Sequence, residues 1–172
     1  KIWCTNHSRD RVKESFAETL KKLKVDYLDL LLIHWPMGFK ETGAELFPNN
    51  ADGKLEASEI SFIETYKAME ELVREGKVKS IGVSNFNMQQ LQEVLDSCQI
   101  RPAVNQIEVH PYNQNRRLVE FCAENEVAVE AYAPIGCGHI QDAFTKSCNL
   151  LDDPVLAEIA KKHGIPLYID AC

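Results

Sequence analysis

Apolar residues recur along the chain at two spacings, and the alternation between these spacings predicts alternating helices and strands. Spacings of three and four residues predict helices at 8–24, 58–75, 88–98, 113–126 and 153–163. Short runs rich in Leu, Ile and Val predict strands at 27–34, 78–83, 103–109 and 127–132. Because the runs are nearly continuous rather than alternating, they indicate a parallel sheet covered by helices.

Residues that favour helix ends support these bounds. Ser8 stands where it can cap the first helix, and Asp152 or Asp153 stands where it can cap the last. Gly76 and Gly164 follow helical patterns and predict C-terminal stops.

The order of these elements predicts the fold class. The last three strands follow one another at intervals of about one β/α unit, and no GxGxxG turn follows the first strand. This pattern favours a barrel over an open dinucleotide-binding sheet. A complete barrel has eight units and typically ~250 residues. We therefore expect an α/β protein with part of a TIM (β/α)₈ barrel, about four parallel strands alternating with helices, in a single domain over 1–172.

One long segment, 37–57, interrupts the rhythm of short connections. It follows the first strand, so it lies at the C-terminal rim where barrel enzymes build their sites. Its Gly, Pro, Asn and Asp residues indicate a loop, and loops of this length tend to shape pockets. We expect it to contribute to a binding pocket.

Composition and charge exclude several classes of function. The 172 residues carry a net charge of −7, which argues against a nucleic-acid partner. No apolar run approaches the ~20 residues of a membrane helix, and no signal-peptide pattern is present. The chain starts at Lys1 without Met, so we expect an incomplete chain of a cytoplasmic protein. Its six cysteines have no CxxC or zinc-ligand spacing, and we expect reduced thiols and no metal site.

Polar and aromatic residues gather where the predicted strands end. In a parallel barrel these ends share one rim, so the side chains are expected to face a common site. Each also has a structural explanation: a lone His can be part of the fold, Ser and Asn are common in turns, and Trp and Tyr can be core. Gln106 is harder to dismiss, since an unpaired buried amide costs ~1–3 kcal/mol. The candidates are His34, Trp35, Ser84, Asn85, Gln106 and Tyr132.

Three of these strand ends lie in longer motifs that identify a family. The strings LIHWP, EELVREGKVKSIGVSNF and NQIEVHPY closely resemble the aldo-keto reductase family, and the GVSNF segment is the most specific. The opening KIWCTNH resembles the end of the family's third strand and the loop after it. The resemblance runs from residue 1 to about residue 165.

The resemblance implies a role for each matching residue. Lys1 matches the catalytic lysine that lowers the pKa of an acid tyrosine, and His34 matches the histidine that orients the substrate carbonyl. Trp35 matches a wall of the substrate pocket. The residues implied to hold the nicotinamide are Ser84, Asn85 and Gln106 on its carboxamide and Tyr132 stacked on its ring. The residues implied to contact the pyrophosphate are Ala133, Pro134, Ile135, Gly136 and Cys137.

The implied activity is NAD(P)H-dependent reduction of aldehydes or ketones to alcohols by hydride transfer. Reduction places negative charge on the carbonyl oxygen, so a proton donor with a lowered pKa is required. The resemblance implies NADPH as cofactor, with NADH not excluded, a small-molecule carbonyl substrate, and a monomeric full-length protein.

Some features depart from the family pattern. The acid tyrosine and its aspartate partner precede the lysine in the family, and the segment that grips the 2′-phosphate follows residue 172. Ala133 replaces a usual Ser, Cys137 replaces a small polar residue, and the tail 166–172 does not resemble the family's next helix. A truncated, non-catalytic isoform or regulatory subunit is therefore the alternative. A hydrolase or lyase would need paired carboxylates or a metal cluster, which Glu108 alone does not supply.

Overall fold

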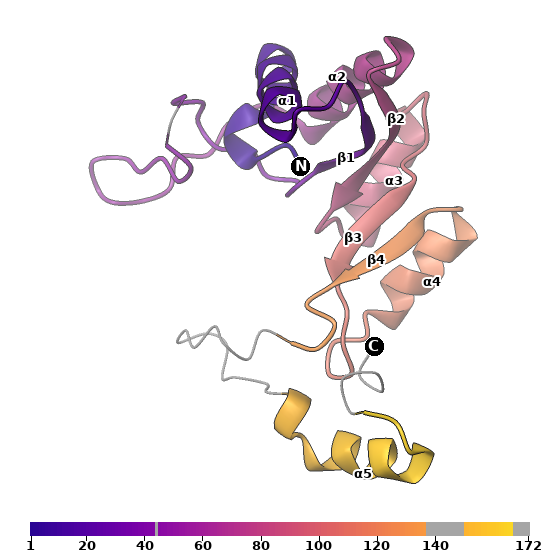
Figure 1. Cartoon of the computed structure of the whole chain (residues 1–172). Coiled ribbons are helices and arrows are strands. Elements are labelled where there is room, and N and C mark those ends of the chain that lie inside the picture. Colours follow the sequence, from indigo (N-terminus) through magenta and orange to yellow (C-terminus); the bar gives the residue numbers. More distant parts are fainter. Residues whose placement is uncertain (44, 137–149, 167–172) are drawn as a thin grey trace. The chain divides into compact units, whose positions relative to one another are not determined.

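A computed structural model describes residues 1–43, 45–136 and 150–166, and these residues form alternating helices and strands (Figure 1). The helices are η1 (Cys4–Asn6), α1 (Arg9–Leu23), α2 (Phe62–Arg74), α3 (Met88–Ser97), α4 (Arg116–Glu124), η2 (Leu150–Asp152) and α5 (Pro154–His163). The strands are β1 (Leu28–Ile33), β2 (Val78–Ser84), β3 (Val104–Glu108) and β4 (Ala128–Tyr132).

The four strands form one sheet in the order β1-β2-β3-β4. Strands β1 and β2 are parallel, with Ile33 opposite Val83, and β2 and β3 are parallel, with Ser84 opposite Gln106. Ile2 adds a parallel bridge beside β1, since its N–H donates to the Leu32 carbonyl at 2.8 Å. The predicted α/β fold, with four parallel strands alternating with helices, is confirmed.

The chain forms two compact units. The first comprises Lys1–Gln106 and Leu118–Val129, and the second comprises Ile107–Arg117 and Glu130–Cys172. No helix in the described ranges is both long enough and apolar enough to cross a membrane.

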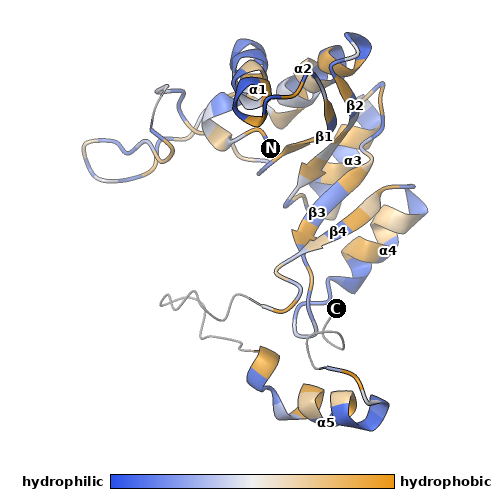
Figure 2. Cartoon of the chain, viewed as in Figure 1, coloured by the Kyte–Doolittle hydropathy of each residue, from blue (hydrophilic) through white to orange (hydrophobic). Residues whose placement is uncertain are grey.

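The core of the first unit lies between its strands and helices. Ile33, Ile81 and Val83 from the strands are almost fully buried together with Met69 and Leu72 from α2. In Figure 2 the strands carry much of the hydrophobic colour, whereas α1 is mostly hydrophilic with apolar patches, as expected for a helix with one face against the core.

Two polar side chains of α2 fasten this helix to the connection between α3 and β3. The Glu70 carboxylate is almost fully buried and its Oε1 accepts from the backbone N–H groups of Gln99 and Ile100, at 2.6 and 2.8 Å. The Tyr66 hydroxyl donates to the Ile100 carbonyl at 2.9 Å. Buried backbone groups need such partners, so these bonds set where α2 lies.

Gly82 allows β2 and β3 to approach closely. A Cβ at this position would lie 2.4 Å from the Val104 carbonyl oxygen and 2.9 Å from a Leu32 methyl carbon. Carbon and oxygen atoms that are not bonded cannot come so near, so position 82 requires glycine. This approach places the following residues, Ser84 and Asn85, against the end of β3.

Several helix ends differ from the prediction. Ser8 does occupy the N-cap of α1, but its side chain does not cap the helix and binds Glu41 instead. Helix α2 begins four residues later than predicted because Ser61 caps it, while Ser58 binds the Gly38 carbonyl through its N–H at 2.9 Å.

Helix α4 is also shorter than predicted. Asn113 and Asn115 both donate through Nδ2 to the Glu108 carbonyl, at 3.2 and 2.8 Å, and Asn115 has a left-handed φ of 46°. These side-chain bonds hold a turn and delay the helix, as is typical of Asn.

In the second unit, Asp153 rather than Asp152 caps α5. Its Oδ1 accepts from the N–H groups of Val155 and Leu156, both at 2.9 Å, and Gly164 ends the helix with a φ of 66°. The Tyr112 hydroxyl also donates to the Asp153 carboxylate. Leu150 and Leu156 are buried together beside this cap.

Candidate functional site

Strand pairing brings together three of the predicted site residues of the first unit. The Gln106 carbonyl accepts from the Ser84 hydroxyl at 2.8 Å and from the Asn85 N–H at 3.0 Å. Ser84 is fully buried and directly opposite Gln106 in the sheet. The C-terminal ends of β2 and β3 therefore present a hydroxyl and two amides side by side.

Asn85 also connects this group to the end of β1. Its Nδ2 donates to the His34 carbonyl at 2.9 Å and to the Ser84 hydroxyl at 3.2 Å. Its φ of 64° is left-handed, a conformation that Asn tolerates better than most residues. Asn85 thus fixes the spacing between the ends of β1 and β2.

Lys1 reaches the same rim from the bridge beside β1. Its ammonium donates to the Gln106 side-chain oxygen, although the two residues are 105 positions apart. Because Lys1 and Gln106 lie on opposite sides of β1 and β2, their hydrogen bond crosses the ends of these two strands. The structure therefore brings together Lys1, His34, Ser84, Asn85 and Gln106.

His34 lies between two tryptophans. Its ring is 5.0 Å from the Trp3 ring, edge to face, and 6.4 Å from the Trp35 ring, nearly parallel to it. Partial burial lowers the pKa of His34 below its ordinary value, and the nearby Lys1 ammonium lowers this pKa further. The imidazole is therefore neutral at physiological pH and presents one N–H donor.

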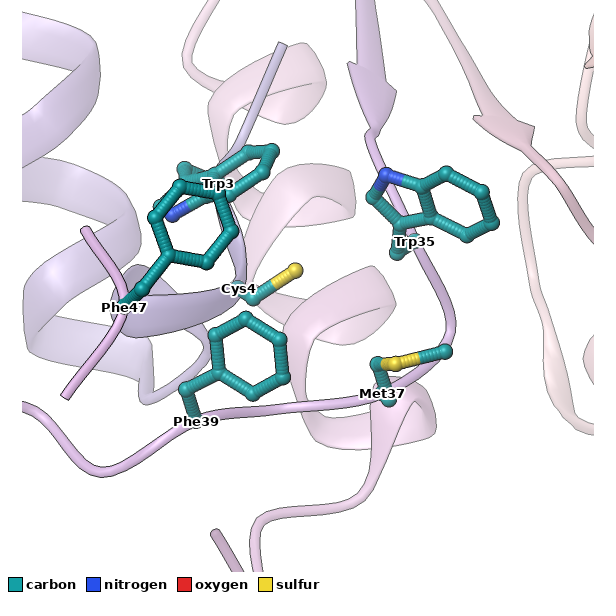
Figure 3. A pocket seen from close by; sticks show the side chains of 6 residues that line it. All are labelled: Trp3, Cys4, Trp35, Met37, Phe39 and Phe47. Carbon is teal, nitrogen blue, oxygen red and sulfur yellow. The ribbon is translucent and has the colours of Figure 1, made fainter. Parts of the chain in front are cut away.

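An apolar cavity of about 330 Å³ adjoins these rings. Figure 3 shows its lining side chains around the hollow, with the Cys4 sulfur directed into it. Trp35, for which the family resemblance implies a place in a pocket wall, lines this cavity. The full lining is Trp3, Cys4, Trp35, Met37, Phe39 and Phe47.

The long rim loop does contribute to a pocket, as predicted, through Met37, Phe39 and Phe47. The sequence prediction did not assign these residues, nor Trp3 and Cys4, to the site. Aromatic residues within a rim loop are a usable signal, but their inward direction depends on how the loop folds back. Cys4 is a poor nucleophile, because burial raises its pKa to about 11.

The remaining predicted residues belong to the second unit. Tyr132 is the last residue of β4, and Ala133 to Gly136 form a turn in which the Gly136 N–H donates to the Ala133 carbonyl at 2.8 Å. Ala133 and Gly136 have positive φ values of 48° and 76°. Pro134 and Ile135 lie within the turn. Cys137 lies outside the described residues, so its predicted contact with the pyrophosphate stays a prediction.

Neither tyrosine of the first unit stands in for an acid at this site. Tyr66 is buried, its hydroxyl binds the Ile100 carbonyl, and burial raises its pKa far above the ordinary value. Tyr27 precedes β1, at the end of the strand away from His34. The described ranges also contain no group of three or more His, Cys, Asp or Glu side chains arranged to hold a metal ion.

Comparisons with known proteins agree with this geometry. The sequence matches the Aldo/keto reductase family over residues 1–171. Aldo-keto reductase family 1 member A1 of Mus musculus is 41% identical over 164 residues, which are 95% of this chain and 50% of that protein. The Gallus gallus protein of the same name is 40% identical over 163 residues, with the same shares. The chain thus spans about half the length of these relatives.

Solved structures give the same result. The aldose reductase from Schistosoma japonicum superposes with a TM-score of 0.88 at 41% identity, over 98% of this chain and 52% of that one. The aldose reductase from Giardia lamblia gives a TM-score of 0.85 at 40% identity, over 95% and 53%. The partial barrel therefore matches aldose reductase structures.

Proposed function

Since the chain belongs to the aldo/keto reductase family, we propose that the full-length protein is an NAD(P)H-dependent oxidoreductase that reduces aldehydes or ketones to alcohols. One observation carries this proposal: Lys1, His34, Ser84, Asn85 and Gln106 converge over the ends of adjacent strands. An aromatic cavity of suitable size adjoins them.

His34 is proposed to orient the substrate carbonyl. A neutral imidazole donates one N–H to an oxygen without carrying a charge of its own, and the lowered pKa of His34 keeps it neutral. As negative charge develops on the carbonyl oxygen, the hydrogen bond from the imidazole N–H becomes stronger. This stabilises the transition state more than the bound substrate and so speeds reduction. The Trp3 and Trp35 rings contact the imidazole and limit its rotation.

Lys1 is proposed to support proton delivery. Its ammonium lies close enough to lower the pKa of His34, so it also lowers the pKa of an acid placed beside it. A phenol has an ordinary pKa of ~10 and needs a nearby cation to donate at neutral pH. In the family the acid is a tyrosine that precedes the lysine, and the full-length protein is proposed to supply it.

The residues at the strand ends fit a nicotinamide carboxamide. Amide side chains offer both a donor and an acceptor, and Asn85 and Gln106 lie beside the Ser84 hydroxyl. A bound reduced nicotinamide supplies the hydride. Side chains that hold the carboxamide would fix which face of the nicotinamide ring is presented. The stacking role of Tyr132, which belongs to the second unit, stays a prediction from the family resemblance. NADPH is the proposed cofactor, with NADH as the second choice.

The test is an assay of the full-length protein with an aromatic aldehyde and either NADPH or NADH. Turnover is measured as the decrease in absorbance of the reduced cofactor at 340 nm. Replacing His34 with Phe is expected to lower kcat/KM about 100-fold, because phenylalanine has no N–H group to donate to the carbonyl oxygen. The control is His163→Asn, at the exposed end of α5, which is expected to keep wild-type activity. No turnover by the wild type with either cofactor would refute the proposal.

A non-catalytic role is the second candidate for the polypeptide of these 172 residues alone. The absence of a suitable tyrosine among the described residues of the first unit favours it. Assay of this polypeptide beside the full-length protein separates the two roles, since turnover by the polypeptide alone would exclude the non-catalytic one.

We further propose that the full-length protein is a cytoplasmic monomer that binds small carbonyl compounds rather than nucleic acid or membranes. The net charge of −7 supports the absence of a nucleic-acid partner. Cell fractionation and light scattering test these points directly.

A further inference from the structure

The loop 37–57, here called the pocket loop, supplies half of the cavity lining from an extended position. Figure 1 shows it reaching away from the strands of its unit. Its base is fixed by backbone bonds: the Phe39 N–H donates to the Cys4 carbonyl at 2.8 Å, and the Ser58 N–H donates to the Gly38 carbonyl at 2.9 Å. Further backbone bonds join the two arms of the loop, from the Lys40 N–H to the Glu56 carbonyl at 2.9 Å and from the Glu56 N–H to the Pro48 carbonyl at 2.8 Å.

A carboxylate of the pocket loop docks on the start of α1. Glu41 Oε1 accepts from the Ser8 N–H at 2.8 Å, and Oε2 accepts from the Ser8 hydroxyl at 2.9 Å. Ser8 is the N-cap residue, yet its hydroxyl is used for Glu41 and makes no capping bond within the helix. A carboxylate at a helix N-terminus is also favoured by the helix dipole. Both carboxylate oxygens of Glu41 thus bind Ser8.

Leu46 and Phe47 of the pocket loop contact Trp3, which lies beside His34 in the candidate site. The Trp3 indole N–H donates to the Leu46 carbonyl at 2.9 Å, and the Trp3 and Phe47 rings meet edge to face at 5.4 Å. Phe47 is 55% exposed, so packing alone holds it weakly. The loop on either side of Phe47 is held by Glu41 and Leu46 before it and by the bond from the Glu56 N–H to the Pro48 carbonyl, at 2.8 Å, after it. Among these contacts, the Glu41 bonds are the ones that a side-chain substitution within the loop can remove.

We infer that Glu41 is a positioning residue that fixes the width of the apolar cavity by anchoring the pocket loop to Ser8. The inference rests on the proposed function, because the cavity is taken as the substrate pocket. Glu41 does not line the cavity and acts through Phe47. Without the anchor, Phe47 is held only through its neighbours Leu46 and Pro48 and by ring contacts, so it shifts within the wall. A bulky apolar substrate then loses contact area that a small substrate does not use.

Steady-state kinetics of the full-length protein test this inference with two aldehydes, 2-naphthaldehyde and propanal. Glu41→Ala is expected to raise KM for 2-naphthaldehyde about tenfold, the effect of losing charge-assisted bonds that act only on binding. KM for propanal, KM for the reduced cofactor and kcat are expected to stay within about twofold of wild type. A general loss of structure would lower kcat for both substrates and would not separate them.

Two further variants keep the test decisive if Glu41→Ala folds poorly. Glu41→Gln retains an acceptor for the Ser8 N–H and is expected to restore most of the affinity. Ser8→Ala removes the hydroxyl but keeps the N–H, so an intermediate rise in KM is expected. Glu45→Ala is the matched control, because Glu45 is an exposed carboxylate of the same loop.

A binding measurement separates failure of this inference from failure of the proposed function. Calorimetry with 2-naphthalenemethanol, the product of 2-naphthaldehyde reduction, is expected to show about tenfold weaker binding to Glu41→Ala than to wild type. The titration is done with NADPH present, because a reduced cofactor cannot accept a hydride from the alcohol. Equal affinities of Glu41→Ala and Glu45→Ala, or an unchanged KM for 2-naphthaldehyde in an active enzyme, would overturn the inference.

Discussion

His7 shows how a single buried side chain couples stability to pH. Its imidazole is fully buried, and neither ring nitrogen has a hydrogen-bond partner in the part of the chain that the structure describes. Burial lowers the pKa of His7 to about 4, against a smaller opposite effect of Glu41. Space beside the ring is tight, since a Cβ on Gly38 would lie 3.2 Å from Nδ1. The ring is therefore neutral when folded.

This pKa predicts the direction of the pH dependence. Between pH ~6.5 and ~4 the unfolded state binds a proton at His7 and the folded state does not, so the free energy of unfolding decreases as the pH falls. The loss across this window is about 3 kcal/mol. His7→Phe is expected to remove this part of the slope in urea denaturation of the full-length protein between pH 7 and pH 4. His163→Gln, exposed on α5, should retain it; equal slopes for both variants would contradict the prediction.

At the scale of elements, hydrophobic spacing predicted every helix of more than three residues and every strand in the described ranges, but not all of their ends. The ends that differ are set by polar side chains that choose among several partners. Ser8 binds Glu41, 33 positions away, instead of capping α1, whereas Asn113 binds the carbonyl of Glu108, five positions before it, and so delays α4. Gly76 and Gly164 were predictable because their positive φ values are a local property of glycine.

Glu70 gives an element-scale prediction. Glu70→Ala leaves the N–H groups of Gln99 and Ile100 without their acceptor, and it is expected to lower the free energy of unfolding by about 3 kcal/mol. Both N–H groups share Oε1, so Glu70→Gln keeps an acceptor and is expected to cost about 1 kcal/mol. Urea denaturation of the full-length protein measures both values. Equal losses for the two variants would show that the carboxylate's charge, not the shared oxygen, holds α2.

At the scale of the molecule, the candidate site was predictable as far as strand ends define it. His34, Ser84 and Asn85 end or follow an apolar run, and parallel strands bring such ends to one rim. Gln106 lies inside β3 and reaches this rim because it pairs with Ser84, the last residue of β2. The cavity was not predictable residue by residue. Trp3 and Phe47 are 44 positions apart and meet only because the loop folds back. Contacts between residues so far apart in sequence depend on tertiary packing, which the spacing of apolar residues along the chain does not predict.

The isolated 172-residue polypeptide is expected to fold poorly. A sheet cut from a barrel has strand edges whose N–H and C=O groups lack neighbours, and such edges favour aggregation. Circular dichroism and light scattering are expected to show a broad thermal transition and assembly of the polypeptide, against a sharp transition of the full-length protein. A cooperative melt of a monomeric 172-residue polypeptide would contradict this expectation.

The close approach at Gly82 has a consequence for how this sequence can change over time. Every other amino acid carries a Cβ, which would lie 2.4 Å from the Val104 oxygen. Each missense mutation of the Gly82 codon therefore introduces the same collision, whatever the new side chain. No substitution at position 82 is conservative in this respect, so related sequences that keep this strand pairing are expected to keep the glycine.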